Sequence, residues 1–392
     1  MMPVAEALDR LLSLTRPVGT EIVSLSEADG RVLRAPLTAK RTQPPFAASA
    51  MDGYAVRAED ARAGATLRVT AEIPAGALAS AALRPGETMR IFTGAPLPEG
   101  ADAILLQEDA ERSGETVTVG ETVETGAWVR PAGGDFRDGA TLVDPGRRLR
   151  PQDVALAAAA GLPWLTVARK PRVSLIATGD ELRLPGEPTG PSEIVSSNNF
   201  GVAALLARHG AEPVCHPIVR DDVDALRAAI RAARASDLIV TLGGASVGDH
   251  DFSRDAFEAE GMTPDFYKIA MRPGKPLMAG RLGDALVVGL PGNPVSAMVC
   301  AHIFLRPALD ALLGLPAGPL PRTGRKLAIE LPESGPREQY MRASLDAEGR
   351  VRPAENQDSS LLSVLAAADV LMVRPARDGA RAAGDTIECI DL

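Results

Sequence analysis

Acidic side chains follow several apolar runs that are typical of β-strands. Glu181 comes just after the run at residues 173–178, and Asp221 comes just after the run at residues 213–219. In an open parallel sheet, ligands bind outside the carboxyl ends of the strands, so these carboxylates are expected at one edge. Carboxylates beside a phosphate site usually hold a hard cation such as Mg²⁺. The candidate acidic residues at this edge are Glu181, Asp221, Asp249 and Asp251.

Residues suited to binding an anion follow other runs of the same kind. The glycine-rich segment 243–248 can point backbone N–H groups at a phosphate. Asn293 is suited to cap a helix that begins at Pro294, and a helix N-terminus favours anions. The candidate anion-binding residues, including two side chains that add positive charge, are Gly243, Gly244, Ser246, Gly248, Arg272, Lys275, Asn293 and Pro294.

Each of these features also has a simpler interpretation. A glycine pair is commonly a tight turn, and Asp221-Asp222 suits the N-cap of a following helix. Residues 290–294 could be only a stiff helix start, and Lys268 could be an exposed strand lysine. Their joint placement at strand ends favours a binding site over a set of independent turns.

An alternation of strands and helices predicts the architecture that positions these residues. Between residues 172 and 317, short apolar runs alternate with helical patterns at 199–209, 223–235 and 252–260. This alternation is typical of βαβ units and a mostly parallel sheet. We therefore predict a multidomain α/β protein with a central αβα domain of mostly parallel sheet.

β-rich lobes are predicted on either side of that domain. Between residues 46 and 133, short β-like runs alternate with Gly/Pro turns, which indicates an inserted β lobe. The lobe holds a second polar cluster that includes Asp52, although Asp52-Gly53 alone is most simply a turn. After a Pro/Gly linker at residues 316–322, the remaining chain predicts a small β-rich module.

The bulk composition disfavours several classes of protein. The formal net charge is −9, which disfavours a nucleic-acid surface because neutralising phosphates requires a basic face. The three cysteines are widely spaced, so neither a disulfide framework nor structural zinc is expected. The N-terminus has no apolar signal-peptide region, and residues 295–313 predict a core helix because they include charged side chains. We expect a cytoplasmic protein that spans no membrane.

Several short motifs together resemble the molybdopterin molybdenumtransferase family, which comprises the MoeA proteins and the equivalent domain of gephyrin. The motifs occur in family order along the chain, and their combination is very specific. They are residues 49–55 (SAMDGYA), 93–95 (TGA), 178–182 (TGDEL), 243–248 (GGASVG), 273–276 (PGKP) and 290–296 (LPGNPVS).

The resemblance implies four domains and a dimer. Residues 1–45 and 134–171 would form a helical and mixed dimerisation domain, and residues 46–133 the inserted β lobe. Residues 172–317 would form the αβα molybdopterin-binding domain, and residues 318–392 the C-terminal β module. Each active site of the implied elongated homodimer would lie between the αβα domain of one subunit and the β lobe of the other. Molybdopterin adenylyltransferase and proteins of molybdoenzyme maturation are candidate partners.

The implied reaction takes adenylylated molybdopterin and molybdate as substrates and uses Mg²⁺. The adenylate is hydrolysed, AMP leaves, and the two dithiolene sulfurs of the pterin bind molybdenum. The resemblance implies that Asp52, Thr93, Asp135, Glu181, Asp221 and Asp251 are catalytic, with Glu181, Asp221 and Asp251 as metal ligands. The implied substrate contacts are Arg130, Asn198, Gly243, Gly244, Ser246, Gly248, Lys268, Arg272, Lys275, Pro291, Asn293, Pro294 and Ser359.

Two positions depart from the family pattern. Arg272 stands where a second lysine is frequent, and a planar guanidinium grips an anion differently from an ammonium. Ser196 stands where Asp or Asn is common, which puts one polar contact to the ligand in question.

Two other functions compete with this interpretation. A molybdopterin adenylyltransferase uses the same αβα domain but does not need the β lobe. A non-catalytic molybdopterin-binding scaffold would not need the acidic residues.

Overall fold

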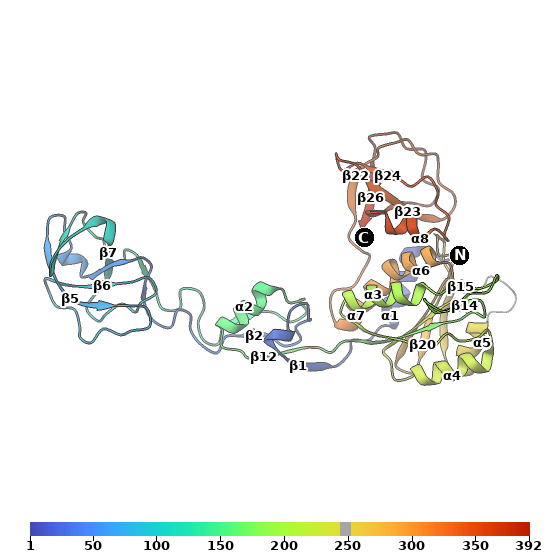
Figure 1. Cartoon of the computed structure of the whole chain (residues 1–392), viewed down its shortest axis with the longest axis horizontal. Coiled ribbons are helices and arrows are strands. Elements are labelled where there is room, and N and C mark those ends of the chain that lie inside the picture. The colour runs from blue at the N-terminus through green and yellow to red at the C-terminus, as the bar shows by residue number, and fades with distance from the viewer. Residues whose placement is uncertain (244–251) are drawn as a thin grey trace. The chain divides into compact units, whose positions relative to one another are not determined.

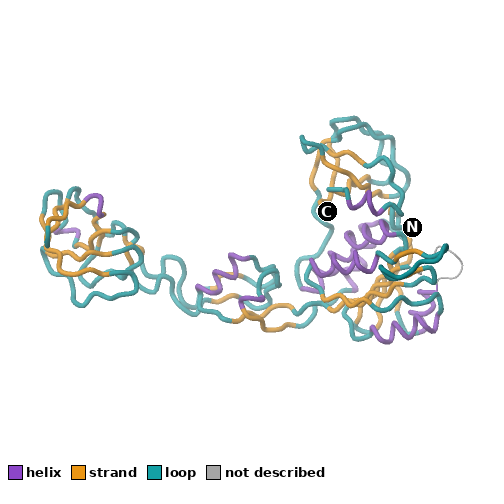
Figure 2. Tube along the Cα trace, in the orientation of Figure 1, coloured by secondary structure: helices purple, strands orange, loops and turns teal. Residues whose placement is uncertain are grey.

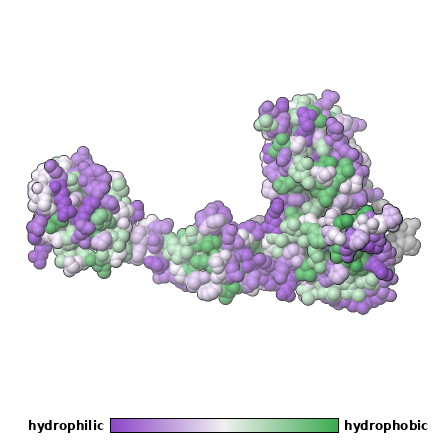
Figure 3. Space-filling model, in the orientation of Figure 1, coloured by the Kyte–Doolittle hydropathy of each residue, from purple (hydrophilic) through white to green (hydrophobic). Residues whose placement is uncertain are grey.

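The computed structural model describes residues 1–243 and 252–392 and divides into two compact units (Figure 1). The larger unit comprises Met1–Glu21, Gly30–Val32 and Val167–Leu392, and the smaller one comprises Ile22–Asp29 and Leu33–Thr166. Strands and loops make up most of the smaller unit, whereas the larger unit holds most of the helices (Figure 2). Hydrophilic and hydrophobic residues are interspersed on the visible face of both units (Figure 3).

A six-stranded sheet forms the centre of the larger unit. Its order is β16-β13-β17-β21-β20-β18, and the first four strands are parallel. Strands β20 and β18 continue the sheet in antiparallel pairing. The predicted α/β class with a mostly parallel sheet is confirmed. The strands are β13 (Arg172–Ala177), β16 (Glu212–Cys215), β17 (Leu238–Leu242), β18 (Thr263–Lys268), β20 (Pro276–Leu282) and β21 (Ala285–Leu290).

The edge strand β16 is shorter than predicted. We expected a strand over residues 213–219, but β16 ends at Cys215. Pro217 has no N–H to donate, and a proline interrupts the hydrogen bonding of a sheet. Pairing resumes at Val219, which forms an isolated bridge with Thr178 at the end of β13.

Helices cover both faces of the sheet because successive side chains of each strand point to opposite sides. Leu175 of β13 packs into the core under α3 and α6, and its neighbour Ile176 packs into the core under α4 and α5. The helices are α3 (Asn198–Arg208), α4 (Val223–Ala233), α5 (Phe252–Ala259) and α6 (Pro294–Cys300).

The first helix, α1 (Val4–Leu14), lies elsewhere than expected. We predicted that it belongs with residues 134–171, but its buried Ala7, Leu8 and Leu11 join the core of the central sheet. It contacts β20 and α7 (Arg306–Leu313). The periodicity of an amphipathic helix shows which face is buried but not which distant core receives that face.

The chain from Pro294 to Leu313 is one helix with a π-helical turn at Ala301–Leu305. It is the one described helix long and apolar enough, by length and composition, to cross a membrane. Of its most apolar 18-residue window, 72% is buried inside the protein. This helix is therefore a core helix, as the sequence predicts.

The C-terminal module is β-rich and packs against the central sheet. Its main sheet has the order β19-β23-β25-β26-β22, and β24 pairs with β23. Tyr340 and Leu371 of this module belong to the same apolar core as the central helices. Its elements are β22 (Thr323–Lys326), β23 (Glu338–Leu345), β24 (Val351–Pro353), α8 (Leu362–Ala366), β25 (Val370–Arg374) and β26 (Thr386–Asp391), and the central segment adds β19 (Met271–Arg272) beside β23.

The smaller unit contains a six-stranded sheet of order β7-β4-β6-β5-β9-β8. Tyr54 of β4 packs into an apolar cluster on one face, and its neighbour Ala55 packs into a second cluster on the other. The strands are β4 (Gly53–Val56), β5 (Thr66–Ile73), β6 (Glu87–Ile91), β7 (Ala103–Leu106), β8 (Ala110–Ser113) and β9 (Thr116–Val119).

Shorter elements complete the fold. Helix α2 (Pro151–Ala159) is followed by Gly161, whose φ of +81° is typical of a glycine that ends a helix. Four two-stranded pairs are β1 (Thr20–Ser24) with β12 (Trp164–Ala168), β2 (Leu37–Thr38) with β11 (Thr141–Val143), β3 (Ala48–Ser49) with β10 (Val129–Arg130), and β14 (Leu182–Arg183) with β15 (Ile194–Val195).

Candidate active site

A cavity of about 890 Å³ lies at the carboxyl ends of β13, β17 and β21 in the larger unit. This is the edge at which an open parallel sheet binds its ligands. Seven short segments of the chain line it. Most of the strand-end residues that were selected from the sequence and that the structure describes are among the lining residues. Those lining residues are Glu181, Asn198, Asp221, Gly243, Lys275, Pro291, Asn293 and Pro294.

A tight turn after β13 brings Glu181 to the wall of the cavity. Gly179 has φ +150°, and a Cβ atom at this position would lie 2.5 Å from Glu181 Oε2. The carboxylate of Glu181 therefore folds back over the backbone of Gly179, and a side chain at position 179 would displace it. The carbonyl of Glu181 accepts a hydrogen bond from the N–H of Ile194 at 2.8 Å, which ties the turn to β15.

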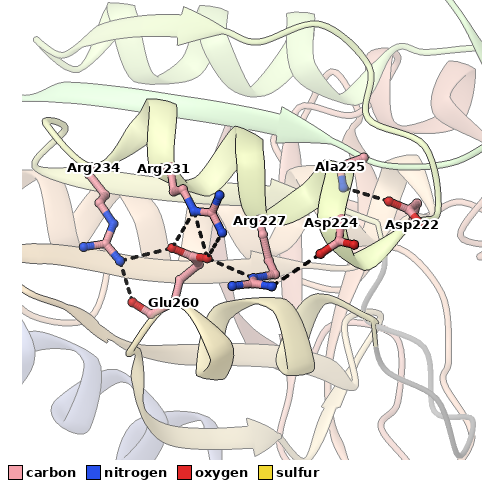
Figure 4. Close-up of polar contacts among 7 residues, drawn as sticks. All are labelled: Asp222, Asp224, Ala225, Arg227, Arg231, Arg234 and Glu260. Atoms are coloured by element: carbon pink, nitrogen blue, oxygen red, sulfur yellow. Dashed lines mark hydrogen bonds and ion pairs between the residues drawn. The ribbon is translucent and has the colours of Figure 1, made fainter.

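Asp221 lies beside this turn. Its backbone N–H donates to Asp180 Oδ1 at 3.4 Å. Burial raises the pKa of the Asp221 carboxyl, and repulsion from Asp180 and Glu181 raises it further. The next residue has a structural role, because Asp222 Oδ1 accepts from the N–H of Ala225 at 2.8 Å and caps α4 (Figure 4). Asp221 therefore lines the cavity, whereas Asp222 caps α4.

The loop before α6 is held from two sides. Asn198 Nδ2 donates to the carbonyl of Gly292 at 2.7 Å. Asn293 Nδ2 donates to Ser359 Oγ at 2.9 Å, and the carbonyl of Ser359 accepts from the N–H of Val295 at 3.1 Å. Asn293 stands at the N-cap position and Pro294 is the first residue of the helix, as predicted, but the Asn293 side chain makes no capping hydrogen bond. The structure thus brings Ser359 of the C-terminal module to the start of α6.

The predicted basic residues occupy different positions around this edge. Lys275 lines the cavity, and its carbonyl accepts from the N–H of Ile269 at 3.1 Å. Lys268 is exposed at the end of β18, opposite Pro276 in the sheet, and does not line the cavity. Arg272 is exposed on β19, where it pairs with β23, and also lies outside the lining.

Gly243 ends the described part of the central loop. Its φ is +97°, and a Cβ atom there would lie 2.8 Å from the carbonyl oxygen of Thr178. The ends of β13 and β17 therefore approach each other closely at this glycine. The other candidates in this loop lie outside the described residues. They are Gly244, Ser246, Gly248, Asp249 and Asp251.

The predicted metal ligands stay a prediction. Within residues 1–243 and 252–392, no group of three or more His, Cys, Asp or Glu side chains lies close enough to hold a metal ion. Glu181 and Asp221 lie at the cavity, and the third predicted ligand, Asp251, falls in the undescribed segment. Ser196, where the family often has a carboxylate or amide, is buried and donates to Asn199 Oδ1 at 3.0 Å.

A second polar cluster lies at one end of the sheet in the smaller unit. Asp52 Oδ1 accepts two hydrogen bonds from Thr93, from the backbone N–H at 2.8 Å and from Oγ1 at 2.7 Å. The backbone bond, followed by the hydroxyl bond, lowers the pKa of Asp52. Two residues predicted for this region, Arg130 on β10 and Asp135, are exposed, and no described hydrogen bond ties their side chains to Asp52.

Arg90 is a residue of this cluster that the sequence analysis missed. Its guanidinium carbon lies 5.1 Å from the ring centre of Tyr54 and 5.0 Å from that of Phe92. Its charge also lowers the pKa of Asp52 after the larger effect of the Thr93 bonds. The available signal was an arginine two residues before an aromatic residue at the end of a strand, because residues two apart in an extended chain share a face.

Three regions of the chain match family models. Residues 2–161 match the MoeA N-terminal region (domain I and II). Residues 174–311 match a probable molybdopterin binding domain, and residues 325–392 match the MoeA C-terminal region (domain IV). The matches follow one another along the chain and leave only short segments between them.

Relatives match over most of their length. A protein of Mycobacterium tuberculosis named molybdopterin molybdenumtransferase 2 is 37% identical over an alignment of 395 positions, which covers 97% of this chain and 96% of that protein. A protein of Nostoc sp. named molybdopterin molybdenumtransferase is 38% identical over 336 residues, which are 83% of this chain and 77% of that protein. The crystal structure of a molybdopterin biosynthesis MoeA protein from Pyrococcus horikoshii has a TM-score of 0.87 at 28% identity, and 100% of each chain is covered.

Proposed function

The chain belongs to the MoeA family, and we propose that it inserts molybdate into adenylylated molybdopterin, with hydrolysis of the adenylate and release of AMP. The relatives named molybdopterin molybdenumtransferase support this function. The observation that carries the proposal is the strand-end cavity, where Glu181 and Asp221 meet Lys275 and the start of α6.

The reaction brings two anions together, molybdate and the phosphoanhydride of the adenylate. Lys275 and the positive end of the α6 helix dipole would offset their repulsion. Asn198 and Ser359 hold this loop from both sides without any ligand. Donors that are already oriented need no reorganisation when charge develops, which favours the transition state.

We further propose that Mg²⁺ is bound at this cavity. The residues fit the ion, because the Asp221 and Glu181 carboxylates repel each other and carboxylate oxygens are the ligands that Mg²⁺ prefers. These two residues would hold it, with Asp251 as the expected third ligand. Bound Mg²⁺ would supply Lewis-acid polarisation of the phosphate and a bound water of lowered pKa.

Removal of the ion tests this part of the proposal. Chelation with EDTA should abolish AMP release, and added Mg²⁺ should restore it. Glu181→Gln and Asp221→Asn should each need more Mg²⁺ for half-maximal rate. Full activity of the chelated protein would exclude a role for the ion.

We assign Asp52 to the orientation of the attacking water. Thr93 occupies Oδ1 and keeps the carboxylate ionised, and no donor among the described residues engages Oδ2. An ionised carboxylate oxygen can accept a hydrogen bond from a water and later its proton. Residues Thr93, Arg130 and Asp135 are proposed to act with it on the smaller unit.

We propose that the chain works as a cytoplasmic homodimer in which each active site uses residues of both subunits. The family resemblance supports this arrangement, with the lobe that carries Asp52 serving the cavity that carries Lys275. Mixing Asp52→Asn subunits with Lys275→Met subunits tests it. Recovery of part of the activity in the mixture would support shared sites, whereas an inactive mixture would exclude them.

The decisive assay follows AMP released from adenylylated molybdopterin with molybdate and Mg²⁺. The wild-type protein should release AMP, and Glu181→Gln should release little while keeping its fold. Glu212→Gln, a change of an exposed carboxylate at the far end of β16, is the matched control and should behave as wild type.

The same assay separates the two alternative functions. A molybdopterin adenylyltransferase would join molybdopterin to AMP from ATP and would not release it. A scaffold would bind molybdopterin without releasing AMP at all. Either result would overturn the proposed function.

A further inference from the structure

Arg90 is enclosed by groups that surround the Asp52 turn. Tyr54, its partner across from β4, and Phe92, two residues along the chain, place their rings about 5 Å from its guanidinium carbon. A guanidinium near an aromatic ring is attracted to the ring face, and such contacts restrict the orientation of its planar fork.

The fork of Arg90 binds two groups at the ends of neighbouring strands. Nη1 donates to the carbonyl of Gly53 at 3.3 Å, and Nη2 donates to Gln107 Oε1 at 2.5 Å. Gly53 begins β4, directly after Asp52, and Gln107 directly follows the end of β7. Arg90 on β6 therefore links the ends of both strands that flank the turn.

These contacts close a ring around Asp52. Its carbonyl accepts from the N–H of Gln107 at 3.3 Å, and its carboxylate accepts from Thr93, which follows the same strand as Arg90. This closed circuit consists of the hydrogen bonds from Thr93 to Asp52, the chain from Thr93 back to Arg90, and the hydrogen bonds from Arg90 to Gln107 and from Gln107 to Asp52. The orientation of the free carboxylate oxygen of Asp52 depends on every member of this ring.

The charge of Arg90 has the sign that this role requires. Asp52 is half-buried, and Arg90 is the cation whose field reaches its carboxylate. Two carboxylates lie on the same strand ends, Glu72 opposite Arg90 on β5 and Glu108 beside Gln107, which donates to it at 3.1 Å. Arg90 is the positively charged member of this set, so its removal would leave Asp52 with only the carboxylates of Glu72 and Glu108.

We propose that Arg90 is a positioning residue that acts through Asp52, holding its carboxylate in the orientation required for the attack on the adenylate. This inference rests on the proposed function, because it assigns Arg90 a part in the AMP-releasing reaction. Arg90 itself need not touch the substrate.

A double-mutant cycle in the full-length protein tests the inference. Arg90→Met removes the fork and its charge, and kcat for AMP release should fall about 10- to 100-fold with little change in KM, since small displacements of a catalytic group have effects of this size. In an Asp52→Asn background, Arg90→Met should cause no further loss, because residues that act as one unit are not additive. Arg90→Lys keeps the charge without the fork and should lie between wild type and Arg90→Met.

Two further variants keep the test interpretable. Arg68→Met removes an exposed arginine of the adjacent strand, which pairs with Glu87 at 2.7 Å, and should leave kcat unchanged. Phe92→Leu removes one of the two aromatic rings but keeps Arg90, and it should reduce kcat less than Arg90→Met does. If Arg90→Met does not fold, the loss of kcat in Phe92→Leu tests the same inference.

The outcomes distinguish the two hypotheses. Wild-type kcat in Arg90→Met, or equal factors of loss in the wild-type and Asp52→Asn backgrounds, would overturn the inference about Arg90. Wild-type AMP release in Asp52→Asn would instead refute the assignment of Asp52 in the proposed function.

Discussion

Asn293 donates a hydrogen bond from Nδ2 to Ser359 Oγ at 2.9 Å, across 66 residues of sequence. Asn293 occupies the N-cap position of α6, the helix that begins at the cavity, and its side chain binds Ser359 of the C-terminal module and not the helix backbone. The helix start therefore depends on a segment that forms a different sheet. The anion-binding end of α6 is shaped by the C-terminal module as well as by the central domain.

Ser359→Ala should weaken substrate binding and leave the fold intact. The backbone bond between Ser359 and Val295 remains in this variant, so the module should stay docked. Loss of one side-chain hydrogen bond is worth about 1 kcal/mol, which corresponds to a rise in KM of about fivefold. Steady-state kinetics of AMP release measure this, with Ser363→Ala, an exposed serine on α8, as the control. An unchanged KM in Ser359→Ala would contradict the role of this contact.

Thr93→Val should move the acid limb of the pH–activity profile to higher pH. Both bonds from Thr93 lower the pKa of Asp52, and valine removes the hydroxyl bond while the backbone bond stays. The pKa of Asp52 then rises, so activity that needs the ionised carboxylate is lost at a higher pH on acidification. Thr93→Ser keeps the hydroxyl and should follow wild type. Superimposable profiles of kcat for Thr93→Val and wild type would show that Asp52 is not the group that titrates.

Glu260→Gln should reduce stability in a pH-dependent way. Glu260 directly follows α5 and accepts hydrogen bonds from three arginines (Figure 4). Arg227 and Arg231 belong to α4, and Arg234 is the residue that ends this helix. Arg231 first, then Arg227, lowers its pKa from 4.5 to about 2. The stabilisation is therefore complete above pH 4.5 and is lost as the pH falls towards 2.

Urea unfolding of the wild type and Glu260→Gln at several pH values measures this effect. The midpoint of Glu260→Gln should lie below that of wild type at neutral pH, and the two should converge on acidification. Glu212→Gln is the control, because the exposed Glu212 makes only a 3.8 Å ion pair with Arg172, and such pairs contribute little. A difference that stays constant down to pH 2 would contradict the ionic origin of the stabilisation.

Gly179→Ala should displace the carboxylate of Glu181. The added Cβ would lie 2.5 Å from Oε2, so the side chain must move or the turn must distort. A φ of +150° disfavours any residue other than glycine, at a cost of about 1–3 kcal/mol, and the rate of AMP release should fall because Glu181 leaves its position. Gly318→Ala is the matched control, because a Cβ at Gly318 meets no atom within 4 Å. Normal AMP release by Gly179→Ala would argue against the observed position of Glu181 in the reaction.

Local periodicity explains why much of the fold could be predicted. Strand β13 lies within one residue of the apolar run at 173–178, and α4 begins at Val223 as expected. Hydrophobic spacing along a few residues is enough to recognise such elements. The ends of strands were also informative, since Glu181, Asp221 and Lys275 all line the cavity at the edge where parallel strands bind ligands.

Contacts between distant residues explain what could not be predicted. In the sequence, Arg90 is indistinguishable from any other arginine of a strand. Its contacts with the Tyr54 ring and with Gln107 appear only in the folded protein. Lys268 and Arg272 were expected with Lys275, but only Lys275 lines the cavity, because a side chain's direction depends on pairing within the sheet.

By itself, the sequence determined the order of strands and helices, the parallel character of the central sheet and the edge at which the polar residues gather. These properties follow from patterns that repeat within a few residues. The tertiary structure alone decided that α1 packs on the central sheet, that Ser359 reaches Asn293 and that Arg90 binds Gly53 and Gln107 beside Asp52. Each of these depends on which distant surfaces bury each other, and no local pattern carries that information.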